Sequence, residues 1–259
     1  MPWIGLGWHL PQQTRYRLYF RKVGDHTVGT APKFFECVTN FAQLRESFGS
    51  IWKMWGRKRE ELGPGLNLYL GTRRGIPLYI EHRFVNLIWG IEAFHRRKYT
   101  GSSAAPLRDK VERILGQISR TIDKKWLSKK LEHAAEPSLG ERIFETISAI
   151  PLGFDAVRLR TFSDACAKAR NDISHFGGQR HDGGSYNDFA TDLNDKSEAL
   201  ATLYQMLLLH EIGIDKHILK WWVFEGFRSY RIKVYLARVG LIDKSTLDRK
   251  PPKPRDRAT

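Results

Sequence analysis

From about residue 78 onward, hydrophobic positions recur every three or four residues, which is the period of an α-helix. Ser138 is placed to cap one of the predicted helices, and Gly177 and Gly178 end another. An all-α helical bundle is therefore the fold that the pattern favours. The pattern predicts helices over residues 79–98, 107–133, 138–150, 155–176 and 193–212, followed by partly helical sequence to about residue 240.

The first part of the chain shows a different pattern. Residues 14–23 alternate basic and apolar positions, which is typical of a half-buried strand. Residues 41–62 return to helical spacing, and the glycine-rich residues 63–77 predict an irregular connection.

These patterns divide the chain into three parts. Residues 1–44 form a short irregular or partly β N-terminal segment, residues 45–243 a helical domain, and residues 244–259 a disordered basic tail. The N-terminal segment could be a short subdomain or the truncated remainder of a larger domain.

The net charge of the chain indicates which kinds of molecule it could bind. The chain has 43 basic and 28 acidic residues, a formal net charge of +15. Such an excess favours RNA, DNA or anionic lipid, and of these we expect nucleic acid, although a basic surface that only keeps the protein soluble is the alternative. No stretch is long and apolar enough to span a membrane, and the two cysteines are far apart, so we expect a cytoplasmic protein that does not associate with membranes.

One short stretch carries candidate chemistry. "ARNDISHFGG", residues 169–178, places Arg170, Asn171 and His175 near the end of a predicted helix. Histidine can accept or donate a proton near neutral pH, and arginine can hold phosphate oxygens through two N–H groups. Arg170 and His175 are about 140° apart on an ideal helix, so they can meet at one phosphate only if the glycines let the helix end swing or if a second copy of the chain supplies the missing group. A solvated helix end is the alternative reading.

Three further side chains are candidates to support these residues. Glu81 and Glu92 share one row of the predicted helix 79–98, where they could hold Arg170 in place or pair with nearby surface arginines. Ser174 lies next to His175 and is a further accessory candidate.

Three segments together resemble a known family. "ARNDISHFGG" resembles the R-x4–6-H motif of the HEPN superfamily of helical ribonucleases, and "YIEHRFVNLIWGIEAFHRR" and "IWKMWGRKREELGPGLNLYL" resemble the first core helix and the lead-in of its ApeA-like branch. The resemblance covers about residues 45–212. It implies a HEPN-type bundle, a homodimer, RNA as the substrate, cleavage without a metal or cofactor, and a role in anti-phage defence or abortive infection.

The resemblance also assigns roles. It implies that Arg170 and His175 are catalytic and that Asn171 is accessory, and it matches Glu81 and Glu92 to acidic positions of the upstream helix. Members of this branch usually carry a substantial N-terminal sensing domain, whereas about 45 residues precede the match here. A phage-derived trigger or a regulatory protein is a further partner to consider.

Other readings stay open. The chain could be a non-catalytic helical module for RNA binding or dimerisation, or the regulatory subunit of a toxin–antitoxin pair. A second R-x4-H spacing, Arg21–His26, has a glycine inside it and no helical pattern around it, so we interpret it as a chance match. For the tryptophans at positions 52, 55, 221 and 222 we favour core packing over base stacking.

Overall fold

The computed structural model describes residues 6–8, 16–18, 33, 36–73, 78–99, 105–132, 136–178 and 184–247. The chain divides into two compact units, Met1–Cys37 and Val38–Thr259. In the first unit, β1 (Leu6–Trp8) pairs antiparallel with β2 (Tyr16–Leu18), which lies inside the alternating segment 14–23.

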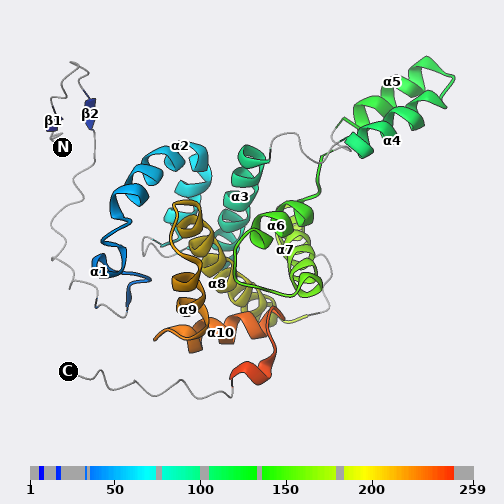
Figure 1. Ribbon diagram of the computed structural model, residues 1–259. Helices are drawn as coiled ribbons and strands as arrows, with labels where there is room; N and C mark the ends of the chain where they lie inside the picture. Colours follow the sequence, from blue (N-terminus) through cyan, green and yellow to red (C-terminus); the bar gives the residue numbers. More distant parts are fainter. Residues whose placement is uncertain are drawn as a thin grey trace, which may run out of the picture. The chain divides into compact units, whose positions relative to one another are not determined.

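The second unit is helical, which confirms the predicted all-α fold (Figure 1). In the described part of this unit no helix is both long and apolar enough to cross a membrane. The elements are α1 (Phe41–Leu44), α2 (Phe48–Arg73), α3 (Ile80–Lys98), α4 (Ala105–Gly116), α5 (Thr121–Lys130), α6 (Leu139–Ser148), α7 (Ala156–Phe176), α8 (Tyr186–Glu211), α9 (Lys216–Phe224), α10 (Ser229–Arg238) and the 3-10 turn η2 (Lys244–Leu247).

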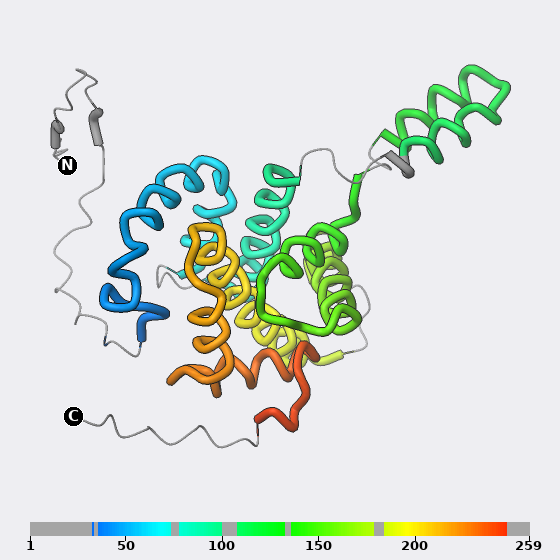
Figure 2. The backbone as a smooth tube through the Cα atoms, viewed as in Figure 1, coloured from blue at the N-terminus to red at the C-terminus, as the bar shows by residue number. Residues whose placement is uncertain are grey.

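Helix α3 lies at the centre of this unit and contacts α2, α6, α7 and α8 (Figure 2). The apolar residues at positions 84, 87, 91 and 94, which recur at helical spacing, are buried, with exposures of 0 to 3%. Val85 and Ile88, in the neighbouring row, are buried as well. A helix that is apolar over most of its circumference must have neighbours on several sides, and α3 has four.

Helices α2 and α3 approach closely through two glycines. A Cβ built on Gly65 would come within 2.6 Å of the carbonyl oxygen of Gly90. Tyr204 of α8 covers this contact, and its buried hydroxyl donates to the same Gly90 carbonyl at 3.1 Å. Three helices therefore meet at a point where a larger side chain has no room.

The predicted irregular connection over residues 63–77 is wrong for most of its length, because α2 continues to Arg73. The backbone breaks only at Gly63, with φ 51° and ψ −140°. Pro64 then begins a new helical segment, where its fixed φ is suitable and its missing N–H costs nothing. The turn residues were recognised correctly, but they mark one kink rather than a loop.

The predicted single helix over residues 107–133 is also wrong, since α4 and α5 are separate helices that pack against each other. Ile122 and Trp126 follow the four-residue apolar spacing that predicts an inner face, yet they are 76% and 62% exposed. Two short helices folded into a hairpin share a narrow interface, and on the α5 side only Leu127 is half-buried. The spacing of apolar residues shows which side of a helix is apolar, but it cannot show whether another element packs against that side.

Several end signals are confirmed, and two burial predictions are not. Ser138 caps α6 in a capping box with Glu141, and the hydrogen bonds that form this box lower the pKa of Glu141. Helix α8 begins at Tyr186, seven residues before the predicted start. Of the tryptophans expected to pack in the core, Trp52 is 67% exposed and Trp221 is 40% exposed. The predicted disordered tail is wrong for residues 244–247, which form η2, and residues 248–259 lie outside the described residues.

The glycine contact predicts opposite results for two substitutions in α2. Gly65→Ala should lower the free energy of unfolding by about 1–3 kcal/mol, because its methyl group would press on the Gly90 carbonyl. Gly71→Ala, where no atom lies within 4 Å of the new Cβ, should be neutral or gain up to about 1 kcal/mol from helix propensity. Urea unfolding of both variants measures the difference, and equal stability of the two would contradict the close approach.

Candidate functional site

The candidate residues lie in the last two turns of α7. Asp155 caps the start of this helix by accepting the backbone N–H of Arg158 at 3.0 Å. Gly177 ends it in the left-handed conformation, φ 72°, and its N–H bonds to the carbonyl of Ile173. A side chain would be strained at that φ, so the glycine fixes where the helix stops. His175 is therefore held one residue from the end of a rigid element.

Arg170 is half-buried against α3. Its side chain is 24% exposed, Nη1 donates to Asn171 Oδ1 at 3.0 Å, and Nη2 lies 3.9 Å from Glu92 Oε2. The Nε atom is buried without a hydrogen-bond partner among the described residues. The guanidinium therefore donates to a neutral amide and lies at ion-pair distance from a carboxylate, and its Nε–H has no acceptor within the described residues.

His175 is placed differently. Its side chain is exposed, as are those of Asn171 and Ser174. The imidazole lies 6.5 Å from the Phe176 ring in an edge-on arrangement. Within the described part of the chain, neither a hydrogen bond nor an ion pair joins it to Arg170, which agrees with the divergence of the two positions on the helix. A single copy does not bring the two groups together.

The two predicted carboxylates have different surroundings. Glu92 meets both interpretations of the sequence, because its Oε2 lies 3.9 Å from Arg170 Nη2 and its Oε1 accepts from the exposed Arg96 at 3.1 Å. Glu81 instead accepts a hydrogen bond from the Tyr186 hydroxyl at 2.8 Å, which joins the start of α3 to the start of α8. The structure therefore brings Glu92, but not Glu81, to the arginine.

Glu92 also belongs to an ion-pair network that extends to α6. Its Oε1 accepts from Nε and Nη2 of Arg96, both at 3.1 Å. Arg96 Nη1 donates to Glu136 at 2.9 Å, and the same carboxylate oxygen accepts from Arg142 at 2.7 Å. Glu92 is thus shared between Arg170 and a network that is itself fixed in place.

The network ends in a buried histidine. His95 is 2% exposed, and its Nε2 lies 2.7 Å from Glu145, while Nδ1 faces Arg142 Nη1 at 3.5 Å. Burial lowers the pKa of His95, and the hydrogen bond to Glu145 offsets this only in part. A neutral imidazole fits both neighbours, because Nε2–H donates to the carboxylate and the Nδ1 lone pair faces a donor.

Sequence reasoning missed most of this network. His95 lies in the same predicted helical row as Glu92, so it could have been noticed as a polar residue on a buried face. Arg142 is buried on the face of α6 that also carries Ile143 and Ile147, a signal of the same kind. Their mutual contact could not be found, because the partners come from distant segments.

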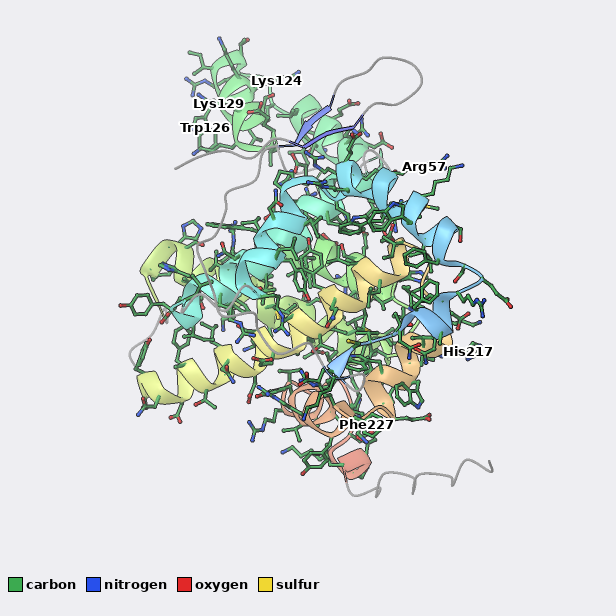
Figure 3. The ribbon with its side chains drawn as sticks, turned by 90° about the vertical axis from the view of Figure 1, so that its left-hand side faces the viewer. Arg57, Lys124, Trp126, Lys129, His217 and Phe227 are labelled. Carbon is green, nitrogen blue, oxygen red and sulfur yellow. The ribbon has the colours of Figure 1, made fainter. Side chains whose placement is uncertain are left out.

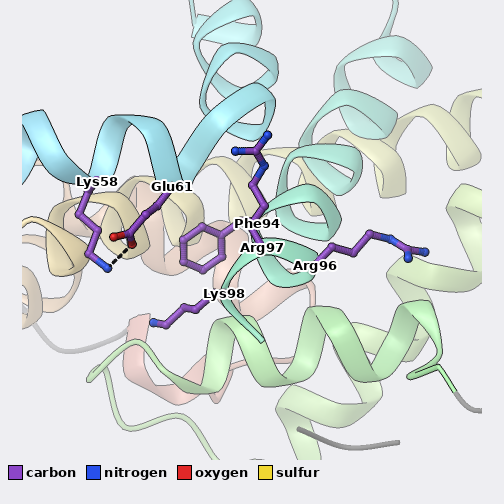
Figure 4. Close-up of a pocket in the computed structure, with 6 residues that line it drawn as sticks. All are labelled: Lys58, Glu61, Phe94, Arg96, Arg97 and Lys98. Carbon is purple, nitrogen blue, oxygen red and sulfur yellow. Dashed lines mark hydrogen bonds and ion pairs between the residues drawn. The ribbon is translucent and has the colours of Figure 1, made fainter. Parts of the chain in front are cut away.

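A cavity of about 630 Å³ lies beside the end of α3 (Figure 4). Its lysines are already paired, because Lys98 and Lys58 both contact Glu211, and Lys58 also bonds Glu61 at 2.6 Å. Burial of Glu211 would raise its pKa, but the two lysines outweigh burial and lower it. The cavity is lined by Lys58, Glu61, Phe94, Arg96, Arg97 and Lys98. In the described part of the chain, no group of His, Cys, Asp and Glu side chains is arranged as a metal site.

The lowered pKa of His95 predicts a pH-dependent stability. Below the ordinary histidine pKa of about 6.5, the unfolded chain binds a proton that the folded His95 resists, so the free energy of unfolding falls as pH drops from about 7. His95→Gln retains a donor for Glu145 and an acceptor for Arg142 but does not titrate, so its stability should fall less between about pH 7 and 5. Urea unfolding across pH measures this. His217→Gln, at an exposed histidine, is the control and should follow the wild type.

The comparison with known families agrees with this architecture. Residues 85–218 match the family model of the Apea-like HEPN domain, a range that runs from α3 into α9 and includes Glu92 and the stretch from Arg170 to His175. No curated protein and no solved structure gives a significant match. Because the matched residues make up more than half of the chain, this protein belongs to the Apea-like HEPN family.

Proposed function

We propose that the protein is an endoribonuclease that cleaves RNA without a metal ion. Its family supports a ribonuclease acting in anti-phage defence. The observation that carries the proposal is the end of α7. There, Glu92 and Asn171 orient Arg170, and an exposed histidine follows within two turns.

The residue types suit transfer of a phosphoryl group within RNA. His175 removes the proton from a 2′-hydroxyl, and the resulting oxygen attacks the adjacent phosphorus. The new bond to O2′ forms as the bond to O5′ breaks, which yields a 2′,3′-cyclic phosphate and a 5′-hydroxyl after O5′ gains a proton. Arg170 stabilises the negative charge of the pentavalent phosphorane, and Asn171 keeps the guanidinium oriented.

Two copies are needed to complete this site. The side chains of Arg170 and His175 leave the helix about 140° apart, so they cannot reach one phosphate from the same α7. A two-fold axis near the end of α7 would bring Arg170 of one copy to His175 of the other. We therefore propose a homodimer with composite sites, in which Glu92 holds the arginine in position.

Substitution of either group should abolish cleavage without unfolding the protein. His175→Ala removes the proton acceptor and Arg170→Ala the phosphate contact, and each should lower the rate by at least about 100-fold. The double variant should be little slower than the worse single one, because the two residues act as a unit. Single-turnover cleavage of total RNA with mapping of the ends, in the presence of EDTA, is the measurement.

His217→Ala is the matched control, since it removes an exposed histidine from α9 and should leave the rate unchanged (Figure 3). Full activity of a folded His175→Ala protein would contradict the proposal, as would 3′-hydroxyl ends or inhibition by EDTA. Folded variants that still bind RNA while the wild type never cleaves it would favour the non-catalytic RNA-binding module instead.

Mixing the two inactive variants tests the composite site. If Arg170 of one copy works with His175 of the other, a mixed dimer of Arg170→Ala and His175→Ala chains contains one intact site out of two. After free exchange of subunits, about a quarter of the wild-type activity should return. If both groups act from the same chain, mixing restores nothing.

A further inference from the structure

We propose that helix α5 is a docking surface for single-stranded RNA, on which Trp126 stacks against a base while surrounding lysines contact the phosphates. This inference rests on the proposed function, because cleavage defines RNA as the ligand. It concerns a surface outside α7. The hairpin of α4 and α5 contributes no residue to the site described above.

Trp126 is available for such a contact. Its side chain is 62% exposed, and Ile122, one turn earlier, is 76% exposed. An indole with this exposure is accessible to a ligand, and Ile122 adds apolar area one turn away. Every base has a flat face that can stack on an indole, so a single exposed tryptophan suffices to hold one nucleotide.

The charges around Trp126 are free to meet phosphates. Helix α5 carries four lysines, at positions 124, 125, 129 and 130, and one acidic residue, Asp123. Asp123 lies 3.7 Å from Arg120, and no carboxylate in the described part of the chain pairs with the lysines. Lysines elsewhere, such as Lys58 and Lys98, have carboxylate partners. The lysines of α5 therefore have no carboxylate to displace before they contact an external anion.

Position on the helix brings the lysines and the tryptophan together. At about 100° per residue, Ile122, Lys125, Trp126, Lys129 and Lys130 fall within an arc of about 140°. Lys124 falls outside this arc, about 160° from Trp126, whereas Trp126 and Lys129 lie within it, and both project from α5 in Figure 3. A flat aromatic group flanked by cations is the arrangement with which proteins bind single strands regardless of sequence.

The same features fit a membrane surface less well. A helix that lies in a bilayer interface needs a continuous apolar face along its length. On α5 the exposed large apolar residues are Ile122 and Trp126, whereas Leu127 is half-buried and the remaining positions are polar. Because α5 is basic but lacks a broad apolar face, it favours a polyanion over a membrane. RNA is a polyanion whose bases can also stack on Trp126.

Binding should be measured with the His175→Ala protein, so that RNA stays intact. With a short fluorescent single-stranded RNA, Trp126→Leu should raise the Kd about 5- to 150-fold, whereas Trp126→Phe should retain most of the affinity, because stacking needs an aromatic ring rather than apolar area. Trp52→Ala is the control, since it removes another exposed tryptophan and should leave the Kd unchanged.

The lysines are tested through salt dependence. Replacing Lys125, Lys129 and Lys130 by alanine should reduce the slope of log Kd against log salt by about 0.7 for each phosphate that the variant no longer binds. Replacing Lys53, Arg57 and Arg59 of α2 removes the same charge from another exposed surface and should change the slope less. Equal effects of the two triple variants would mean that net charge, and not α5, binds RNA.

The outcomes separate this proposal from the proposed function. An unchanged Kd for Trp126→Leu overturns the docking surface, whether or not the wild type cleaves RNA. Phosphatidylserine vesicles that bind the protein only when Trp126 is present, with unchanged RNA affinity, overturn it in favour of a membrane. Binding that depends on Trp126 and the lysines, together with a wild type that never cleaves RNA, leaves the docking surface standing and overturns the nuclease.

Discussion

The burial of α3 is the constraint on which the rest of the structure depends. This helix has apolar side chains over most of its circumference, and four helices cover it. The closest approach, at Gly65 and Gly90 beneath Tyr204, leaves no space for a side chain. Because α3 can hardly move within this packing, the polar groups near its C-terminal end are held in fixed positions.

Those polar groups connect the core to the candidate site. Glu92 emerges from the buried helix at the point where α7 passes, and there it meets Arg170. Its other oxygen is held by Arg96, which is held in turn by Glu136 of the segment before α6. A carboxylate with two fixed neighbours has little freedom, so Arg170 is oriented by the fold as a whole. An arginine that must meet a phosphate in one orientation benefits from such support, because binding then costs less entropy.

Sequence reasoning recovered the elements whose signals are local. The period of the apolar positions predicted α3, α6 and α7, and residue types at helix ends predicted the Ser138 cap and the stop at Gly177. The same approach failed where the outcome depended on distant neighbours. It read the break at Gly63 as a loop, and it joined α4 and α5 into one helix, because no local pattern shows which apolar rows find a partner.

The candidate site divides in the same way. Arg170, Asn171 and His175 are adjacent in sequence, so the motif could be recognised without a structure. Whether Glu81 and Glu92 support the arginine or pair with surface arginines depends on how α3 passes α7 and α8, and the sequence alone left both open. Tyr186 engages Glu81, and its position follows from where α8 begins, which was placed seven residues too late.

Basic residues occur in two settings in the described part of this chain: paired with carboxylates around the core, and unpaired on α5. Around the core, cations are neutralised within the fold, as with Arg83 and Glu198 at 2.8 Å or Arg142 and Glu136 at 2.7 Å, and such pairs fix geometry at little gain in stability. On α5 the lysines have no acidic partner in the described part of the chain, so their repulsion is relieved only by solvent, salt or an external anion. The net charge of +15 is therefore no uniform property of the surface. The part of this charge that can attract an external anion lies where the fold leaves cations without acidic partners. On α5 such cations lie near an exposed tryptophan.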